Sequence, residues 1–319
     1  MFRVNHMAVA LAVATAFLSA SVAAEPFAYI SNQLADSVSV IDTKKGTVVA
    51  TIAVAGKPAG VAVAPGGSRI YVSAPEAKGF AVLDAIDRRV ISQVKVGDGT
   101  LGIATAPDGK RIYVADWYTN TVSVIDADSL KILETIVVGQ SPSGLMVSPD
   151  NRWLYVANRL DNSVSQIDLD KLTIRNTTKV GEHPFGLTVD SKGERIYVAN
   201  VESDDVTVLE KSHLKRIATV KVNSRPYAAA LARGDSLLFV TNQDDSSVSV
   251  IDTATLKEIA LIDVGDKPEG IYTHPDDRHV YVANWFDSNV SVIDAQTLKV
   301  VDTIQTGEGS RAFGQFIAK

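Results

Sequence analysis

Aromatic, basic and acidic side chains interrupt an otherwise regular sequence at places where they could bind a ligand. Arginine forks form paired hydrogen bonds with carboxylates and phosphates. Tryptophan and tyrosine rings stack on flat apolar groups. The candidate ligand-binding residues are Asp116, Trp117, Arg159, His183, Arg225, Tyr227, Glu269, Trp285 and Arg311.

The sequence shows no comparable set of residues for catalysis. The chain has no cysteine, which excludes disulfides, thiolate metal sites and thiol nucleophiles. The sequence contains no Gly-x-Ser-x-Gly elbow, phosphate-binding loop or HExxH motif. The histidines beyond the N-terminal segment occupy different repeat positions, which argues against a multi-histidine metal site; they are His183, His213, His274 and His279. We therefore predict no catalytic residue, no metal site and no cofactor.

The candidate residues belong to a repeat with a fixed period of 42 residues. In the unit from residue 144 to 181, four apolar or alternating segments cover 144–148, 153–158, 164–168 and 172–180, separated by turn residues. Units of about 40–45 residues with four hairpin-linked strands are typical of a β-propeller, and a parallel β-helix is disfavoured because these turns suit antiparallel hairpins. An aromatic residue opens the second segment of each unit, at Tyr29, Tyr71, Tyr113, Tyr155, Tyr197, Phe239 and Tyr281.

The repeat predicts an all-β, seven-bladed propeller of four-stranded antiparallel blades over residues 25–319. Residues 27–54 lack a first strand, and residues 313–318 have the register of one. We expect these two segments to share one blade, so that C-terminal strand pairing with the N-terminal blade closes the ring.

The tetrad Tyr-Val-Ala-Asn at 155–158, 197–200 and 281–284 resembles the defining motif of the YVTN family of β-propellers. Tyr-Val-Ala-Asp at 113–116 and Phe-Val-Thr-Asn at 239–242 are close variants. The resemblance covers residues 27–318 and implies an exported, YncE-like propeller. It implies no single activity, because members include periplasmic proteins, surface-layer proteins and companions of quinoprotein pathways.

The candidate residues fall on two sets of loops that should meet at one mouth of the central channel. One set links successive blades, and the other follows each second strand. In the linking set, one position is small or apolar in half of the ring and aromatic or charged in the other half, which suggests an off-centre site. This position is occupied by Ala59, Leu101, Ser143, Phe185, Tyr227, Glu269 and Arg311. The asparagines at the ends of the second strands are expected to be scaffold; they are Asn32, Asn158, Asn200, Asn242 and Asn284.

Residues 1–24 have the form of a secretory signal peptide, with Arg3, an apolar stretch and small residues before Glu25. We expect cleavage after Ala24 or nearby and a soluble, monomeric protein in the periplasm or medium, not embedded in the membrane. Removing one arginine changes the net charge from −6 to −7, which argues against nucleic acid as a partner.

These observations favour a non-catalytic binding or scaffold protein of the cell envelope. Its partner would be an unidentified small molecule or an envelope protein bound at the channel mouth. One alternative is a channel-site hydrolase, lactonase or lyase, with or without a metal, that uses Asp116, His183, Glu269 and the ring formed by the asparagines at the ends of the second strands. The other is a structural surface-layer module.

Overall fold

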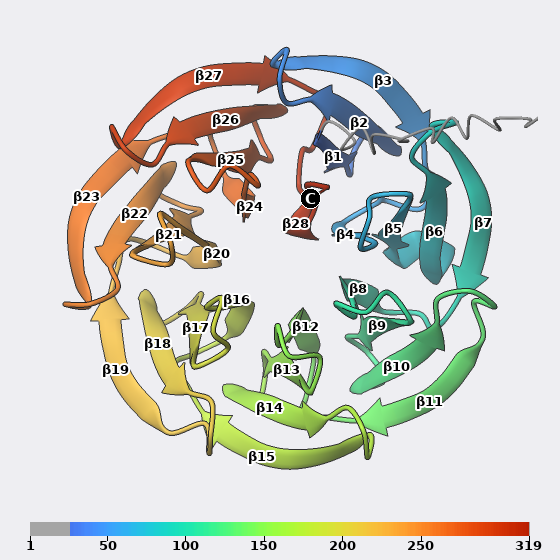
Figure 1. Cartoon of the computed structure of the whole chain (residues 1–319), viewed down its shortest axis with the longest axis horizontal. Coiled ribbons are helices and arrows are strands. Elements are labelled where there is room, and N and C mark those ends of the chain that lie inside the picture. Colours follow the sequence, from blue (N-terminus) through green and yellow to red (C-terminus); the bar gives the residue numbers. More distant parts are fainter. Residues whose placement is uncertain (1–25, 319) are drawn as a thin grey trace, which may run out of the picture.

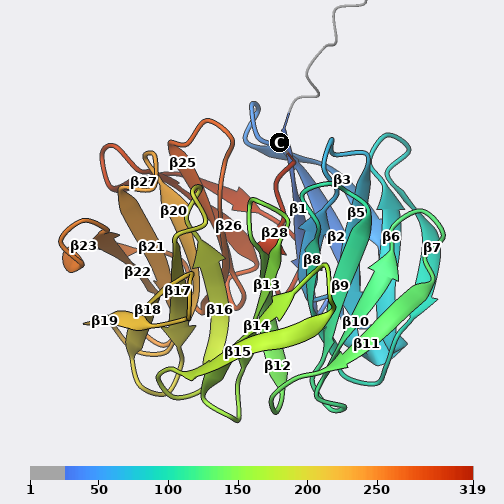
Figure 2. The same cartoon turned by 60° about the horizontal axis from the view of Figure 1, so that its bottom comes forward.

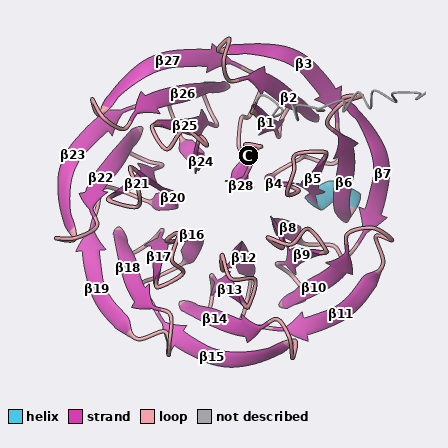
Figure 3. Ribbon diagram, in the orientation of Figure 1, coloured by secondary structure: helices cyan, strands magenta, loops and turns pink. Residues whose placement is uncertain are grey.

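The computed structural model describes residues 26–318, which form seven sheets around a central axis (Figure 1). The predicted seven-bladed propeller is confirmed. In each complete blade the first strand lies at the axis and the fourth at the periphery. Strands provide nearly all regular structure, and η1 (Pro75–Ala77) is the single short helix within residues 26–318 (Figure 3).

We number the blades in chain order from the first complete sheet. Blade 1 contains β4 (Gly60–Val63), β5 (Arg69–Ala74), β6 (Gly79–Asp84) and β7 (Arg89–Lys95). Blade 2 contains β8 (Thr100–Thr105), β9 (Arg111–Asp116), β10 (Thr121–Asp126) and β11 (Ile132–Val137). Blade 3 contains β12 (Pro142–Val147), β13 (Trp153–Asn158), β14 (Ser163–Asp168) and β15 (Thr173–Lys179). Blade 4 contains β16 (Pro184–Val189), β17 (Arg195–Asn200), β18 (Asp205–Glu210) and β19 (Arg216–Lys221).

The ring continues through two more complete blades to the one in which the chain begins and ends. Blade 5 contains β20 (Pro226–Ala232), β21 (Leu237–Asn242), β22 (Ser247–Asp252) and β23 (Lys257–Asp263). Blade 6 contains β24 (Pro268–Thr273), β25 (His279–Asn284), β26 (Asn289–Asp294) and β27 (Lys299–Gln305). Blade 7 contains β1 (Phe27–Asn32), β2 (Ser37–Asp42) and β3 (Thr47–Ala53), and β1 pairs with residues on either side of the C-terminal strand β28 (Phe313–Gln315).

Position in the blade explains the composition of each strand. The second strand β13 is buried along its whole length because neighbouring blades cover both of its faces. The outer strand β7 alternates between exposed and half-buried residues, since one of its faces meets solvent. The aromatic residue of each second strand packs across the gap between blades, as Tyr113 of blade 2 does in the same cluster as Leu145 and Leu154 of blade 3. The regular period therefore builds a continuous core from contacts between adjacent blades.

The loops gather at two opposite faces of the ring (Figure 2). We call one the first-turn face, because it holds the turns between first and second strands, such as 148–152. We call the other the crossover face, because it holds the links between blades and the loops after the second strands. All nine candidate residues belong to the crossover end.

The C-terminal segment closes the ring, as predicted, but it departs from the repeat. Its two ends pair antiparallel with β1, with Ser310 opposite Asn32 and Ile317 opposite Ala28. Between these two pairs the C-terminal segment advances by seven residues and β1 by only four. The three extra residues must therefore bulge out of the pairing. These residues are β28, which turns into the channel and pairs in parallel with β4 of blade 1. The C-terminal segment therefore links blade 7 to blade 1 and also forms part of the channel wall.

Candidate functional site

Four aromatic rings close the channel at the crossover face, and we call them the aromatic plug: Trp117, Phe185, Tyr227 and Phe313. The ring centroids of Phe185 and Tyr227 lie 4.0 Å apart, and those of Phe185 and Phe313 lie 5.4 Å apart. Trp117 follows the second strand of blade 2, and its ring centroid lies 6.4 Å from that of Phe185 in blade 4. Ala59, Leu101 and Val201 complete the cluster. The large residues on one side of the ring thus fill the space that small residues leave on the other.

A buried ion pair supports the plug. Arg311 Nε and Glu269 Oε2 lie 2.6 Å apart, and their side chains are only 16% and 8% exposed. Neither of these two atoms has a hydrogen-bond partner. Each buried charge is therefore compensated by the opposite charge of the pair. The Arg311 guanidinium also donates to the Tyr227 hydroxyl at 2.7 Å. The Gln243 amide donates to the other oxygen of Glu269 at 2.8 Å.

Burial sets the protonation of this cluster. It raises the pKa of the Glu269 carboxyl above its ordinary value, and the Arg311 guanidinium opposes that rise. Burial also raises the pKa of the Tyr227 hydroxyl, which stays protonated and accepts the bond from Arg311. Arg311 also supports the plug directly, because its guanidinium lies 5.5 Å from the centroid of the Phe313 ring.

Arg159 joins the same cluster at its rim. Its guanidinium lies 5.3 Å from the centroid of the Trp117 ring, in a cation–π contact. Five of the nine candidate residues are therefore brought together at the crossover end. They are Trp117, Arg159, Tyr227, Glu269 and Arg311.

His183 and Arg225 lie farther out, in a row of alternating charges that crosses blades. Arg225 donates to Glu202 at 2.9 Å, and Lys267 pairs with Asp244 at 2.7 Å. The His183 Nδ1 atom lies 3.7 Å from the same Glu202 carboxylate. Arg225 is 35% exposed, and pairs at this exposure stabilise a fold little. Carboxylates of the chain itself therefore occupy the cations that could bind an anionic ligand.

Asp116 and the asparagine ring act as scaffold. Asp116 accepts backbone hydrogen bonds from Tyr118 and Thr119, both at 2.9 Å. A Cβ on Gly97 would come within 1.9 Å of the Asp116 carboxylate, so glycine is required there. Each asparagine donates to side chains at the start of the third strand, as Asn242 does to Ser247 and Ser249.

Trp285 does not reach the plug. Its indole N–H donates to the side chain of Gln33 at 3.2 Å, in the loop of the neighbouring blade 7. Its ring packs 6.1 Å from Phe286, which is 67% exposed. The two tryptophans that begin equivalent loops therefore occupy different environments, and they do not form one binding surface.

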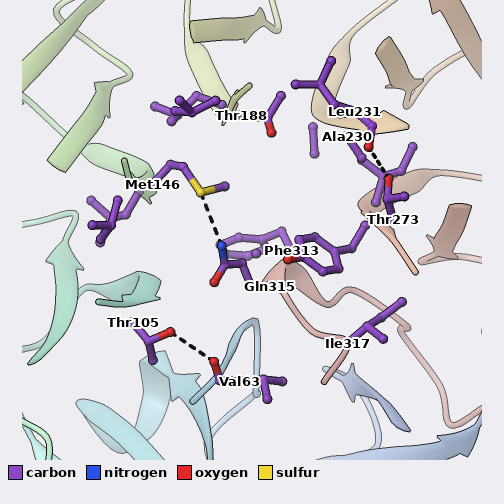
Figure 4. Close-up of a pocket in the computed structure, with 18 of the residues that line it drawn as sticks. Val63, Thr105, Met146, Thr188, Ala230, Leu231, Thr273, Phe313, Gln315 and Ile317 are labelled. Atoms are coloured by element: carbon purple, nitrogen blue, oxygen red, sulfur yellow. Dashed lines mark hydrogen bonds between the residues drawn. The ribbon is translucent and has the colours of Figure 1, made fainter. Parts of the chain in front are cut away.

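The open part of the channel lies at the other end. A cavity of about 720 Å³ begins beside the plug, at Gly102, Gly144 and Gly186, and reaches the first turns at Pro107 and Pro149. Small and apolar residues of the first strands make most of its wall. Figure 4 shows Met146, Thr188 and Gln315 around its centre, with the Gln315 amide directed at the Met146 sulfur at 3.6 Å.

The sequence at this end of the channel has no distinctive pattern. Its wall residues, such as Val63, Thr105 and Ala230, keep the repeat and so carry no signal of their own. Gln315 enters the channel only because β28 bulges inward. Within residues 26–318, no group of three or more histidine, aspartate or glutamate side chains is placed to hold a metal ion, and no helix is long and apolar enough to cross a membrane.

Comparison with known proteins gives two family matches. A model described as "YNCE-like beta-propeller" matches residues 6–107 and 225–309, together more than half of the chain. A model described as "Lactonase, 7-bladed beta-propeller" matches residues 76–213. No curated protein matches the chain.

Similar solved structures have diverse functions. A chain of Kuenenia stuttgartiensis hydrazine synthase is 23% identical with a TM-score of 0.77, over 83% of this chain and 91% of that one. A functionally unknown protein from Desulfotomaculum acetoxidans is 15% identical with a TM-score of 0.78, over 90% and 99%. The dihydro-heme d1 dehydrogenase NirN, in complex with DHE, is 16% identical with a TM-score of 0.69, over 88% and 63%. At these identities the likeness concerns the fold alone.

Proposed function

Because the chain belongs to the YNCE-like β-propeller family, we propose that it is a binding protein that holds a small molecule in the cavity of its central channel. The observation that carries the proposal is the shape of that channel. Its cavity of about 720 Å³ is lined mainly by apolar side chains and opens among the first turns. Ligand pockets in proteins have about 300–1,000 Å³ and the same apolar character with a few polar groups.

The closed end supports binding rather than passage. The aromatic plug and the Arg311–Glu269 pair fill the crossover end, so a ligand would enter and leave through the first-turn face. The candidate residues at the crossover end would then act indirectly, as the floor of the cavity.

A fluorescence titration with Nile red, an uncharged solvatochromic dye, tests this proposal. We expect saturable binding to the wild-type protein and its loss in the double variant Met146→Trp/Thr188→Trp, which fills the cavity. The matched control is the double variant Arg225→Ala/Trp285→Ala, which alters the crossover face outside the plug and should still bind. Binding that survives the filled cavity but disappears in this control would place the ligand at the crossover face and overturn the proposal.

We also propose that the protein acts in the cell envelope after export. The signal-like residues 1–24 support this, although they lie outside the described residues. Expression in a bacterial host should yield a mature protein in the periplasm or medium that begins at or near Glu25. Recovery of the uncleaved chain in the cytoplasm would contradict export.

The lactonase family match favours a second candidate, hydrolysis of a lactone. Asp116, His183 and Glu269 do not converge on one site, so the groups available to such a reaction are Asp235, His274 and Asp277 at the cavity opening. Acid release from aliphatic lactones, measured with and without a chelator, tests this candidate. Turnover that disappears in Asp235→Asn/Asp277→Asn would favour the hydrolase over the binding protein.

A further inference from the structure

The cavity wall has a one-sided charge. The residues that line it include no lysine or arginine, but they include Asp235 and Asp277 at the opening. Neither carboxylate has an ion-pair partner among residues 26–318. Asp235 accepts the backbone N–H of Ser191 at 2.8 Å, and Asp277 accepts that of Gly234, so both are fixed at the rim. An anion that enters must pass two carboxylates without meeting a cation.

His274 does not reverse this charge. Its Nδ1 atom lies 3.2 Å from the backbone nitrogen of Asp276 and 3.1 Å from the carboxylate of the same residue. Nε2 lies 3.2 Å from the Thr43 hydroxyl, which itself donates to the Pro26 carbonyl. A charge on this ring would be balanced by the Asp276 carboxylate, and the second ring nitrogen serves the contact between blades 6 and 7.

The interior presents more hydrogen-bond acceptors than donors. The hydroxyl protons of Thr105 and Thr273 are used on the Val63 and Leu231 carbonyls of neighbouring blades, at 3.1 and 2.7 Å. These threonines offer only lone pairs to a ligand. One N–H of the Gln315 amide points at the Met146 sulfur, a weak acceptor, while its side-chain oxygen remains available in the cavity (Figure 4). A carboxylate, which only accepts hydrogen bonds, finds few donors here.

From this wall we infer that the cavity takes uncharged apolar molecules that carry a hydrogen-bond donor, such as a primary amide or an alcohol, and rejects carboxylates. This inference rests on the proposed function and names the class of its ligand. The amide or hydroxyl group donates to the Gln315 oxygen, and the apolar body packs on the small side chains of the first strands.

Adamantane-1-carboxamide and adamantane-1-carboxylate make a matched pair, because they have nearly the same shape and differ in charge and in donors. Calorimetric titrations at pH 8 and 0.15 M salt should give a Kd at least tenfold lower for the carboxamide. In the variant Asp235→Asn/Asp277→Asn the Kd of adamantane-1-carboxylate should fall at least threefold, while that of the carboxamide should be unchanged. Gln315→Met should weaken the carboxamide severalfold and leave the carboxylate unaffected.

Two controls make the outcomes separable. Asp108→Asn removes an exposed carboxylate of a first turn outside the cavity lining and should change neither Kd. The filled variant Met146→Trp/Thr188→Trp should abolish binding of both compounds. Equal or tighter binding of the carboxylate to the wild-type cavity would overturn the inference and leave the proposed function intact. Failure of both compounds and of Nile red to bind would overturn both.

Discussion

Replacing Arg311 with methionine should leave the buried charge of Glu269 without a compensating partner. Methionine keeps the length and apolar contacts of the side chain but removes the guanidinium that lies 2.6 Å from Glu269. Removal of one partner from a buried ion pair costs about 3–5 kcal/mol, because the remaining charge is left without compensation. For a domain of this size each kcal/mol lowers Tm by about 2 °C, so the expected loss is about 6–10 °C.

The loss should depend on pH. Burial already raises the pKa of Glu269, and without Arg311 nothing comparable opposes that rise. A carboxyl whose pKa is higher in the folded than in the unfolded protein favours folding while it is protonated, and this contribution is lost as pH rises through the folded pKa. The deficit of Arg311→Met should therefore be large at pH 8 and smaller near pH 4.5.

Urea unfolding followed by tryptophan fluorescence at both pH values measures the deficit. The double variant Glu269→Gln/Arg311→Met provides the control, since it removes both charges and should recover most of the stability at pH 8. A cost below about 1 kcal/mol for Arg311→Met, or equal deficits at the two pH values, would refute the idea that the pair compensates a buried charge.

Three further changes test other parts of the structure. Gly314→Ala should lower the free energy of unfolding by about 3 kcal/mol or more, because φ is +106° and the new Cβ would lie 2.5 Å from the Val61 carbonyl oxygen. The control Gly66→Ala, with φ +81° and nothing within 4 Å, should lower it by only about 1 kcal/mol, as measured by urea unfolding. Similar losses in the two variants would contradict the close approach of β28 to β4. Asn242→Ala should lower the free energy of unfolding by about 1–3 kcal/mol in the same assay, since it removes two buried hydrogen bonds to Ser247 and Ser249. It should leave Nile red binding unchanged. Burial raises the pKa of Tyr29, Tyr155 and Tyr281 to about 12, so the stability that their neutral form contributes should decline between pH 10 and 12; absorbance at 295 nm should show delayed ionisation, and Tyr155→Phe should remove one delayed group.

Most of the fold follows from the sequence because it depends on local patterns. The run that begins at Tyr155 recurs at a fixed period, and each copy needs only its neighbours to bury it. The family expected from the tyrosine tetrads is confirmed by the family match. The closure by the C-terminal segment is also confirmed, but the inward bulge of β28 is not visible in the sequence. It depends on a mismatch of three residues between two pairings that only the folded ring creates.

The candidate site is predictable only in part. Repeat register indicated that Tyr227, Glu269 and Arg311 face the same end of the channel, and they do meet there. Register cannot show whether side chains that converge on an axis leave a hole or fill it, since this depends on the ring diameter and on rotamers. Phe185 and Tyr227 reach across the axis and fill it. The ligand-binding role of the nine candidate residues stays a prediction.

The bulged C-terminal segment couples closure of the propeller ring to ligand binding in the central cavity. Pairing of Ser310 and Ile317 with β1 joins residues more than 270 positions apart, so it is the contact with the largest loop-closure cost and the one expected to form last. The same segment places Phe313 and Gln315 against the cavity. A molecule that binds there contacts this segment directly. If it favours the closed ring, it must lower the equilibrium fraction of molecules whose C-terminus is released. Resistance of the C-terminal residues to carboxypeptidase thus becomes a measure of occupancy that requires no knowledge of what the ligand does.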